Sequence, residues 1–146
     1  MEKIGIIGSG TWGTAIAVLL VNNGHEVALW SAIPAEIEEM AKTRTHKNLP
    51  GVTLPEGIIY TADLEEAMKD KNLLVMAVPS VFVRSTAQKM KPFCKEGQLI
   101  VDVAKGIEEN TLDTMTQIIK EELPMAETAV LSGPSPVSYT HLTLPT

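Results

Sequence analysis

The hydrophobic positions of this chain fall into short apolar runs, separated by segments in which apolar and polar residues are mixed. Short apolar runs stopped by Gly or Pro are typical of strands buried in a parallel sheet. They predict strands at residues 3–7, 26–30, 58–60, 73–78, 99–103 and 128–131. The mixed segments predict helices at residues 11–23, 35–42, 64–69, 81–90 and 111–122.

This alternation of strands and helices determines the expected fold class. Strands that alternate with helices at such spacing form βαβ units, in which the crossover between parallel strands is right-handed. We therefore expect an α/β fold with a doubly wound, mainly parallel sheet that is covered by helices on both faces.

Cap and turn residues mark several of the predicted boundaries. Gly24 follows the first helix as a C-terminal stop, and Pro34 stands at the expected start of the second helix. Asp63, with Glu66 three positions later, resembles an Asp variant of the capping box and would open the helix that follows. Residues 43–57 contain several Gly and Pro residues, so we expect a loop there.

Length, charge and hydropathy exclude several classes of protein. The 146 residues provide material for one ordinary hydrophobic core. The formal net charge is −6 and no block of Lys or Arg is present, which argues against nucleic acid as a partner. No apolar run reaches the roughly 18 to 20 residues that a membrane helix needs, so no membrane insertion is expected. We expect a cytoplasmic protein.

A glycine-rich hexapeptide links the first predicted strand to the first predicted helix. It reads G-S-G-T-W-G from Gly8 to Gly13, the G-x-G-x-x-G pattern of dinucleotide-binding units. The first glycine permits a tight turn, the second lets the backbone approach a pyrophosphate, and the third lets the helix pack closely on the strand. The N–H groups of Thr11 and Trp12 would face the phosphates. We expect Gly8, Gly10, Thr11, Trp12 and Gly13 to bind the cofactor.

Two other interpretations of this turn stay open on these residues alone. Glycines also occur in turns that bind nothing, and methyltransferases that use S-adenosylmethionine have a related glycine turn. The place of the hexapeptide, after a strand and at the start of a helix, favours a dinucleotide.

The end of the second predicted strand bears on the choice between NAD and NADP. An Asp or Glu at this place accepts hydrogen bonds from the ribose hydroxyls of NAD and repels the 2′-phosphate of NADP. Here the strand ends at Trp30, and the first acid after it is Glu36. No Arg or Lys stands at the strand end to hold a 2′-phosphate either. The sequence predicts NAD or NADP as cofactor, with NADP slightly favoured.

Five motifs follow one another along the chain. They read G-S-G-T-W-G-T-A at 8–15, N-L-P-G and L-P at 48–51 and 54–55, A-V-P-S with a later Arg at 77–84, A-K-G-I-E at 104–108, and L-S-G-P-S at 131–135. Together these motifs are far more specific than the glycine turn alone, and they resemble those of the bacterial type of NAD(P)-dependent glycerol-3-phosphate dehydrogenase.

This resemblance implies the N-terminal Rossmann domain of an oxidoreductase. Such an enzyme interconverts dihydroxyacetone phosphate and sn-glycerol 3-phosphate with NAD(P)H, and its product feeds phospholipid synthesis. The resemblance implies that Lys105 lies where cofactor and substrate meet. It also implies that Gly133 and Ser135 contact the phosphorylated small-molecule substrate. For the full-length parent, a homo-oligomer is left open.

The resemblance ends after Ser135. Residues 136–146 match no part of the family pattern, and we expect them to be a non-native tail after a dinucleotide-binding domain of residues 1–135. In the family, the catalytic lysine and the groups that hold the substrate's phosphate lie in a C-terminal helical domain beyond this point. We therefore expect no catalytic residue in this chain, and no activity of the chain alone.

Other polar residues receive no functional role from the sequence. Arg84 is interpreted as a charge on a helix face. His25, His46 and His141 lack the spacing of metal ligands, so solvated or hydrogen-bonded histidines and no metal are expected. Cys94 has no partner for an internal disulfide bond and no partner motif, and is expected to be inert.

Two other functions stay open on the sequence. One is a non-catalytic nucleotide-binding module that senses redox state. The other is the N-terminal half of a different NAD(P)-dependent dehydrogenase, such as a 6-phosphogluconate or hydroxy-acid type. The A-K-G-I-E and L-S-G-P-S motifs favour the glycerol-3-phosphate enzyme.

Overall fold

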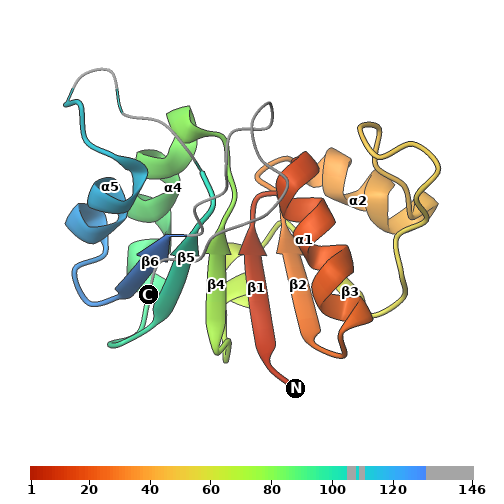
Figure 1. The fold of residues 1–146 in the computed structure, drawn as a ribbon, viewed down its shortest axis with the longest axis horizontal. Coiled ribbons are helices and arrows are strands. Elements are labelled where there is room, and N and C mark those ends of the chain that lie inside the picture. The colour runs from red at the N-terminus through yellow and green to blue at the C-terminus, as the bar shows by residue number, and fades with distance from the viewer. Residues whose placement is uncertain (105–107, 109–110, 131–146) are drawn as a thin grey trace, which may run out of the picture.

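A six-stranded sheet with helices on both faces forms the centre of the computed structural model, which describes residues 1–104, 108 and 111–130 (Figure 1). The strand order is β3-β2-β1-β4-β5-β6, and every neighbouring pair is parallel. The sheet confirms the doubly wound α/β fold that the alternation of elements predicts. Its strands are β1 (Lys3–Ile7), β2 (Glu26–Trp30), β3 (Ile58–Thr61), β4 (Leu73–Met76), β5 (Leu99–Asp102) and β6 (Glu127–Val130).

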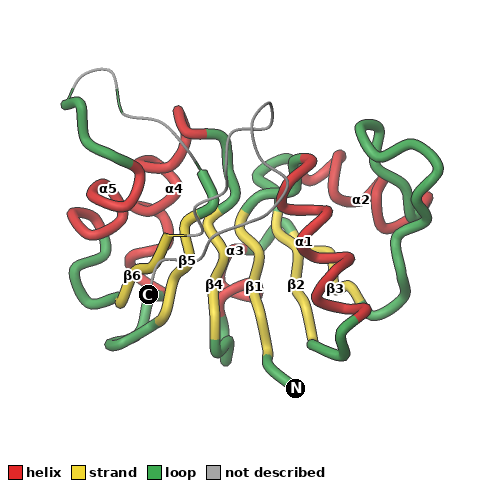
Figure 2. Tube along the Cα trace, in the orientation of Figure 1, coloured by secondary structure: helices red, strands yellow, loops and turns green. Residues whose placement is uncertain are grey.

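The helices form a layer on each face of this sheet (Figure 2). Side chains of α1 and α2 pack against one face, and side chains of α3, α4 and α5 pack against the other. The helix predicted at residues 81–90 divides into a 3-10 turn, η1 (Ser80–Phe82), and α4. A second 3-10 turn, η2 (Lys91–Phe93), follows it. The α-helices are α1 (Thr11–Asn22), α2 (Pro34–Thr43), α3 (Leu64–Met68), α4 (Val83–Met90) and α5 (Met115–Glu122).

Alternate residues of the central strands enter different halves of the core. In β1, Ile4 and Ile6 belong to the cluster under α1 and α2, whereas Ile7 belongs to the cluster under α3, α4 and α5. All three side chains are almost completely buried. Burial of each such side chain contributes roughly 1.5–3 kcal/mol to folding. The apolar run of β1 is therefore a strand buried on both faces, whereas β6 at the edge of the sheet is largely exposed.

The order in which the chain adds strands to the sheet reverses between β1 and β4. These two strands are neighbours, with β2 and β3 on one side of the pair and β5 and β6 on the other. Figure 1 shows the carboxyl ends of the strands at the edge of the sheet away from the N-terminus. The connections that leave β1 and β4 diverge there, which opens a crevice where α/β proteins bind ligands.

The last helix begins later than the sequence predicts. A helix was expected at residues 111–122, but α5 starts at Met115. The N–H of Gln117 donates to Thr114 Oγ1 at 3.2 Å, and the Thr114 N–H donates to Gln117 Oε1 at 2.7 Å. This reciprocal capping box satisfies two N–H groups that have no partner inside the helix. Thr114 therefore determines where the helix starts.

The capping box predicted at Asp63 is only half present. Asp63 Oδ1 accepts a hydrogen bond from the Glu65 N–H at 3.0 Å, so Asp63 does cap α3. Its own N–H donates to Thr61 Oγ1 at 2.9 Å, where the prediction had assigned Glu66 as the acceptor. The hydroxyl at the end of β3 supplies the bond because it lies two residues away and needs no long side chain to reach it.

Candidate functional site

The glycine-rich turn joins β1 to α1 beside the central pair of strands. Gly8 has a φ of +128°, which L side chains rarely adopt, and its N–H donates to Trp30 O at 3.0 Å. A Cβ on Gly8 would lie 2.6 Å from the backbone of Ala77, and a Cβ on Gly13 would lie 2.1 Å from Gly8 O. At Gly10, by contrast, nothing lies within 4 Å of the Cβ position. Packing requires the first and third glycines, while the second leaves open space.

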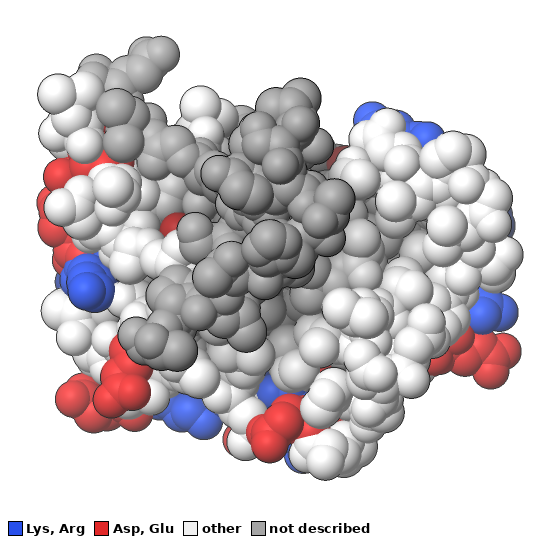
Figure 3. Space-filling view, in the orientation of Figure 1, with Lys and Arg blue, Asp and Glu red and all other residues white. Residues whose placement is uncertain are grey.

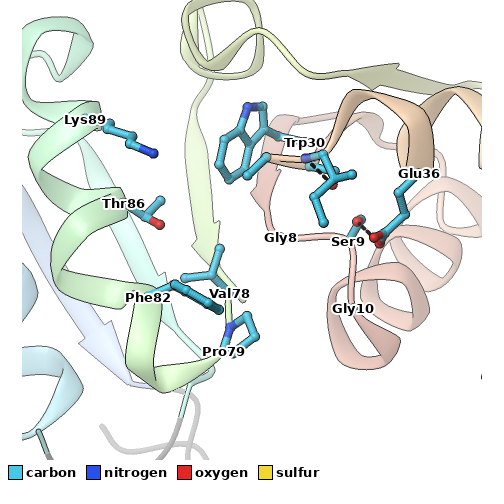
Figure 4. A pocket seen from close by; sticks show the side chains of 13 residues that line it. Gly8, Ser9, Gly10, Trp30, Glu36, Val78, Pro79, Phe82, Thr86 and Lys89 are labelled. Atoms are coloured by element: carbon cyan, nitrogen blue, oxygen red, sulfur yellow. Dashed lines mark hydrogen bonds between the residues drawn. The ribbon is translucent and has the colours of Figure 1, made fainter.

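A cleft of about 430 Å³ opens beside this turn. Its walls come from the turn, from the end of β2 with the start of α2, and from the segment after β4 together with α4 (Figure 4). Ile33, Val78 and Phe82 contribute apolar surface, and Glu36 and Lys89 contribute charges of opposite sign. An apolar cleft of this size with a few polar groups is typical of small-molecule sites.

Hydrogen bonds to Ser9 fix the conformation of the glycine turn. Ser9 O accepts a hydrogen bond from Thr14 Oγ1 at 3.0 Å and lies 3.0 Å from His46 Nε2. His46 Nδ1 accepts from the Asn48 N–H at 3.1 Å, so a neutral ring carries its proton on Nε2 and donates it to Ser9 O. Ser9 Oγ donates to Glu36 Oε1 at 3.0 Å. His46 is thus a buried, hydrogen-bonded histidine, as the sequence predicts.

The start of α1 lies next to the cleft with its N–H groups directed outward. The first N–H groups of any helix have no partner within the helix. Here Gly10 provides no capping side chain, and the first turn contains no acid. Thr11 and Trp12 are exposed, and 68% of Trp12 is accessible to solvent. The positive end of the helix dipole therefore faces a space that suits an anion such as a pyrophosphate.

The predicted site residues divide into those that the structure describes and those that it does not. Lys105, Gly133 and Ser135 lie outside the described residues, as does the boundary expected after residue 135. The predicted cofactor residues that lie together at the turn are Gly8, Gly10, Thr11, Trp12 and Gly13.

Glu36 is a site residue that the sequence interpretation missed. The sequence interpretation names it only as the first acid after β2, but α2 returns over the end of that strand and places it in the wall of the cleft. Its carboxylate points toward Ser9 of the glycine turn (Figure 4). A helical start at Pro34 was the one available signal, because it shortens the path from the strand to the helix.

A buried carboxyl group stands at the end of β5. Asp102 is 2% exposed; its Oδ1 accepts from the Ala104 N–H at 2.9 Å and its Oδ2 from Thr116 Oγ1 at 3.3 Å. Burial raises the pKa of Asp102 to about 6, against the lowering effect of these two hydrogen bonds. The residues around Asp102 do not indicate its contact with Thr116, because Thr116 belongs to a later helix.

Arg84 is more than the helix-face charge that the sequence suggested. Its guanidinium lies 2.9 Å from Glu108 Oε2 and 2.6 Å from Glu122 Oε2, with Asp113 and Glu121 at 3.4 and 3.5 Å. Figure 3 shows acidic side chains gathered at the edge where α5 lies. The hydrogen bond from Arg84 lowers the pKa of Glu108. This cluster ties α4 to α5 and to the segment between β5 and α5.

The described residues contain neither a candidate metal site nor a candidate membrane-spanning helix. In that part of the chain, no group of three or more His, Cys, Asp or Glu side chains could hold a metal ion. Within the same residues, no helix is long and apolar enough to cross a membrane.

The fold and the site together define a class of protein. A doubly wound parallel sheet with a G-x-G-x-x-G turn at its central reversal, next to an apolar cleft, is the arrangement of a dinucleotide-binding Rossmann domain. Residues 3–142 match the family described as NAD-dependent glycerol-3-phosphate dehydrogenase N-terminus. The chain belongs to this family, of which it contains the N-terminal, NAD-binding part, and the predicted resemblance to the family is confirmed.

Individual relatives agree with this assignment. The chain is 53% identical to a glycerol-3-phosphate dehydrogenase [NAD(P)+] of Agathobacter rectalis, in an alignment that covers 100% of this chain and 44% of the relative. For the corresponding protein of Fusobacterium nucleatum the identity is 51%, over 92% of this chain and 41% of the relative. The crystal structure of glycerol-3-phosphate dehydrogenase from Coxiella burnetii has a TM-score of 0.84 and 29% identity, over 91% of this chain and 41% of that one. The chain therefore spans less than half the length of these relatives.

Proposed function

We propose that this chain is the cofactor-binding part of an enzyme that interconverts dihydroxyacetone phosphate and sn-glycerol 3-phosphate with NAD(P)H. The observation that carries the proposal is the turn at Gly10, which leaves open space directly before the uncapped start of α1. Its relatives are named glycerol-3-phosphate dehydrogenase [NAD(P)+], and membership of their family supports the reaction. When bound, the nicotinamide ring donates or accepts the hydride.

The residues of the turn bind and orient this cofactor. Gly8 and Gly13 hold β1 and α1 in close contact, so that the start of the helix is aimed at the cleft. The N–H groups of Thr11 and Trp12 donate hydrogen bonds to the pyrophosphate, assisted by the helix dipole. Gly10 leaves the phosphates room to approach the backbone.

The cleft would hold the adenosine half of the cofactor. Ile33 and Val78 line the cleft and would supply apolar surface for an adenine ring. Lys105, Gly133 and Ser135 are assigned to the nicotinamide and substrate end by the family resemblance alone.

Hydride transfer itself requires more than this chain contains. A substrate must be held against the nicotinamide beside a proton donor, and the family resemblance assigns the catalytic lysine to the following domain. We propose that the chain binds cofactor weakly and turns over no substrate. The same proposal includes a phosphorylated substrate, a link to phospholipid synthesis, a cytoplasmic setting and a homo-oligomeric parent. It also includes a domain boundary at residue 135.

A binding experiment tests the central step. NADH and NADPH are titrated into the chain and into the variant Gly10→Asp, and binding is measured by calorimetry. A carboxylate at Gly10 would stand where the pyrophosphate approaches, so we expect binding to be abolished. Asn22→Asp is the matched control, because it adds the same charge at the far end of α1.

Either of two results would contradict the proposal. One is saturable binding by Gly10→Asp with the affinity of the unaltered chain. The other is turnover of dihydroxyacetone phosphate by the unaltered chain at a rate within tenfold of a full-length relative, which would show that the chemistry does not need the following domain.

A further inference from the structure

Glu36 lies where the structure brings the start of α2 back toward the glycine turn. It belongs to the first turn of the helix, which begins at Pro34. The cleft that Gly8 and Gly10 line on one side has Glu36 in its wall, together with the residues that follow β2. Figure 4 shows its carboxylate directed at Ser9, between the turn and α2.

This placement supplies the acid that β2 lacks. In dinucleotide-binding domains, an Asp or Glu about 20 residues after the glycine turn accepts hydrogen bonds from the ribose hydroxyls of NAD. Here β2 ends at Trp30, and Ser31 and Ala32 follow without an acid. Both Ser31 and Ala32 line the same cleft as Glu36. A helix instead of the strand thus places a carboxylate in the cleft that the end of β2 lines.

We propose that Glu36 binds the adenine ribose and makes this domain select NAD(H) over NADP(H). The inference rests on the proposed cofactor site and deepens it. The carboxylate accepts hydrogen bonds from the vicinal hydroxyls of the ribose, and it repels a phosphate at the 2′ position. This replaces the slight preference for NADP that the sequence suggested, because that preference depended on the absence of an acid.

Fixed hydrogen bonds hold the carboxylate in position before any ligand binds. Ser9 Oγ donates to Glu36 Oε1 at 3.0 Å, and Ser9 O is itself held by Thr14 and His46. Within the described residues, Glu36 Oε2 accepts no hydrogen bond from another side chain, which leaves it available to a hydroxyl donor. A negative charge in the first turn of α2 is also favoured by the helix dipole.

The remaining charges of the cleft do not favour a 2′-phosphate. Lys89 is the one cation among the described residues that line the cleft, and it lies on α4, on the opposite wall from Glu36 (Figure 4). Ser31 Oγ is engaged, because it accepts from the Ile33 N–H at 3.1 Å. A 2′-phosphate beside Glu36 in this cleft would thus meet a carboxylate, with the one described cation of the cleft on the opposite wall. Lys47 lines a separate hollow on the other side of Glu36.

The experiment compares two ligands that differ only in the 2′-phosphate. ADP-ribose and 2′-phospho-ADP-ribose are titrated by calorimetry into the 146-residue chain. Neither contains nicotinamide, so the missing domain affects both equally. Repulsion between a carboxylate and a phosphate of charge about −2, roughly 6 Å apart in a water-like medium, corresponds to about tenfold in affinity. We expect ADP-ribose to bind at least about tenfold more tightly.

Three variants separate Glu36 from other charges. Glu36→Gln keeps the size of the side chain, and we expect it to reduce the preference for ADP-ribose to about threefold or less. Glu38→Gln removes the same charge from an exposed position on the same helix, and it should leave the preference unchanged. Lys89→Gln should also leave it unchanged, because Lys89 lies on the other wall.

Failure of this inference can be distinguished from failure of the proposed function. If the chain binds both ligands equally, or if Glu36→Gln keeps the full preference, Glu36 does not select the cofactor although the dinucleotide site stands. If Lys89→Gln weakens only the phosphorylated ligand, Lys89 holds the 2′-phosphate against the repulsion of Glu36; this cleft then does not exclude the phosphate, and the inference is overturned. If neither ligand binds, the proposed cofactor site fails, and the inference fails with it.

Discussion

Substitution of Gly13 by Ala adds one methyl group at the closest contact between the glycine turn and α1. The new Cβ would lie 2.1 Å from Gly8 O and 3.3 Å from Ala77 Cβ, whereas ordinary contacts begin at 3.4 Å. The oxygen cannot move away cheaply, because the Gly8 N–H is bonded to Trp30 O and because Gly8 already has a φ of +128°. The helix must therefore shift away from β1 by roughly 1 Å to relieve the overlap.

Two opposing effects determine how much stability Gly13→Ala loses. Overpacking of this kind costs about 1–3 kcal/mol, and a contact with constrained backbone belongs at the upper end of that range. Ala is better than Gly within a helix by about 1 kcal/mol, and Gly13 is in the first turn of α1. We expect Gly13→Ala to lower the free energy of unfolding by about 2 kcal/mol.

Gly10→Ala is the matched control, because it makes the same chemical change in open space. Gly10 has an ordinary φ of −68°, and nothing lies within 4 Å of its Cβ position. Loss of a favourable N-cap residue and loss of entropy in the unfolded chain oppose each other, so the net change should stay within about 0.5 kcal/mol.

Urea unfolding followed by the fluorescence of Trp30, which is buried, measures both variants. A titration with ADP-ribose then separates stability from binding. Gly10→Ala should weaken binding without loss of stability, since its methyl group meets the ligand. The reasoning would be refuted if Gly13→Ala were as stable as the unaltered chain, or if Gly10→Ala lost the larger share of stability.

Two further predictions concern charged groups away from the cleft. The pKa of Asp102 is about 6 in the folded chain against 3.8 in the unfolded chain, so the folded state binds more protons between these values and stability falls as pH rises through about 4 to 6. Asp102→Asn should remove this dependence of stability on pH and raise the free energy of unfolding at pH 7.5 by up to about 3 kcal/mol. Urea unfolding at pH 4.5 and 7.5 measures both effects. An unchanged pH dependence in the variant would contradict the prediction. Arg84→Met leaves the acids around it unpaired, so it should lower the melting temperature more than Lys42→Met does, and added salt should narrow that gap. Equal melting temperatures for the two variants would show that the Arg84 cluster contributes nothing.

Most strands and part of the glycine turn are features of this structure that local sequence determines. Most strands are apolar runs, with β6 as the exception, and the demand for glycine at position 13 arises against Gly8 O within the turn itself. Such features can be predicted without knowledge of the tertiary structure. The demand for glycine at position 8, however, comes from Ala77 and Val78 at the end of β4. The start of α5 was misplaced because the box between Thr114 and Gln117 was not recognised, although both residues were visible in the sequence.

Contacts between distant segments could not be predicted in this way. Arg84 meets Glu108 and Glu122, which follow it by 24 and 38 positions. Nothing in the neighbourhood of Arg84 indicates that α4 and α5 pack side by side, and a charge on a helix face is normally solvated. The same holds for His46, whose partner Ser9 precedes it by 37 positions. Only the folded sheet brings these groups together.

The arrangement around Ser9 explains how an acidic chain can bind a polyanion. The formal net charge is −6, but charges separated by more than about 8–10 Å are largely screened at physiological salt, so local groups decide the affinity. Close to the pyrophosphate those groups are the N–H donors at the start of α1, whose first turn contains no acid. Among the described residues, Glu36 is the one acid close to these donors, and it accepts a hydrogen bond from Ser9 Oγ of the turn. One carboxylate held there can accept from a ribose while the helix start receives the phosphates, which lets attraction for the pyrophosphate and rejection of a 2′-phosphate coexist in one cleft.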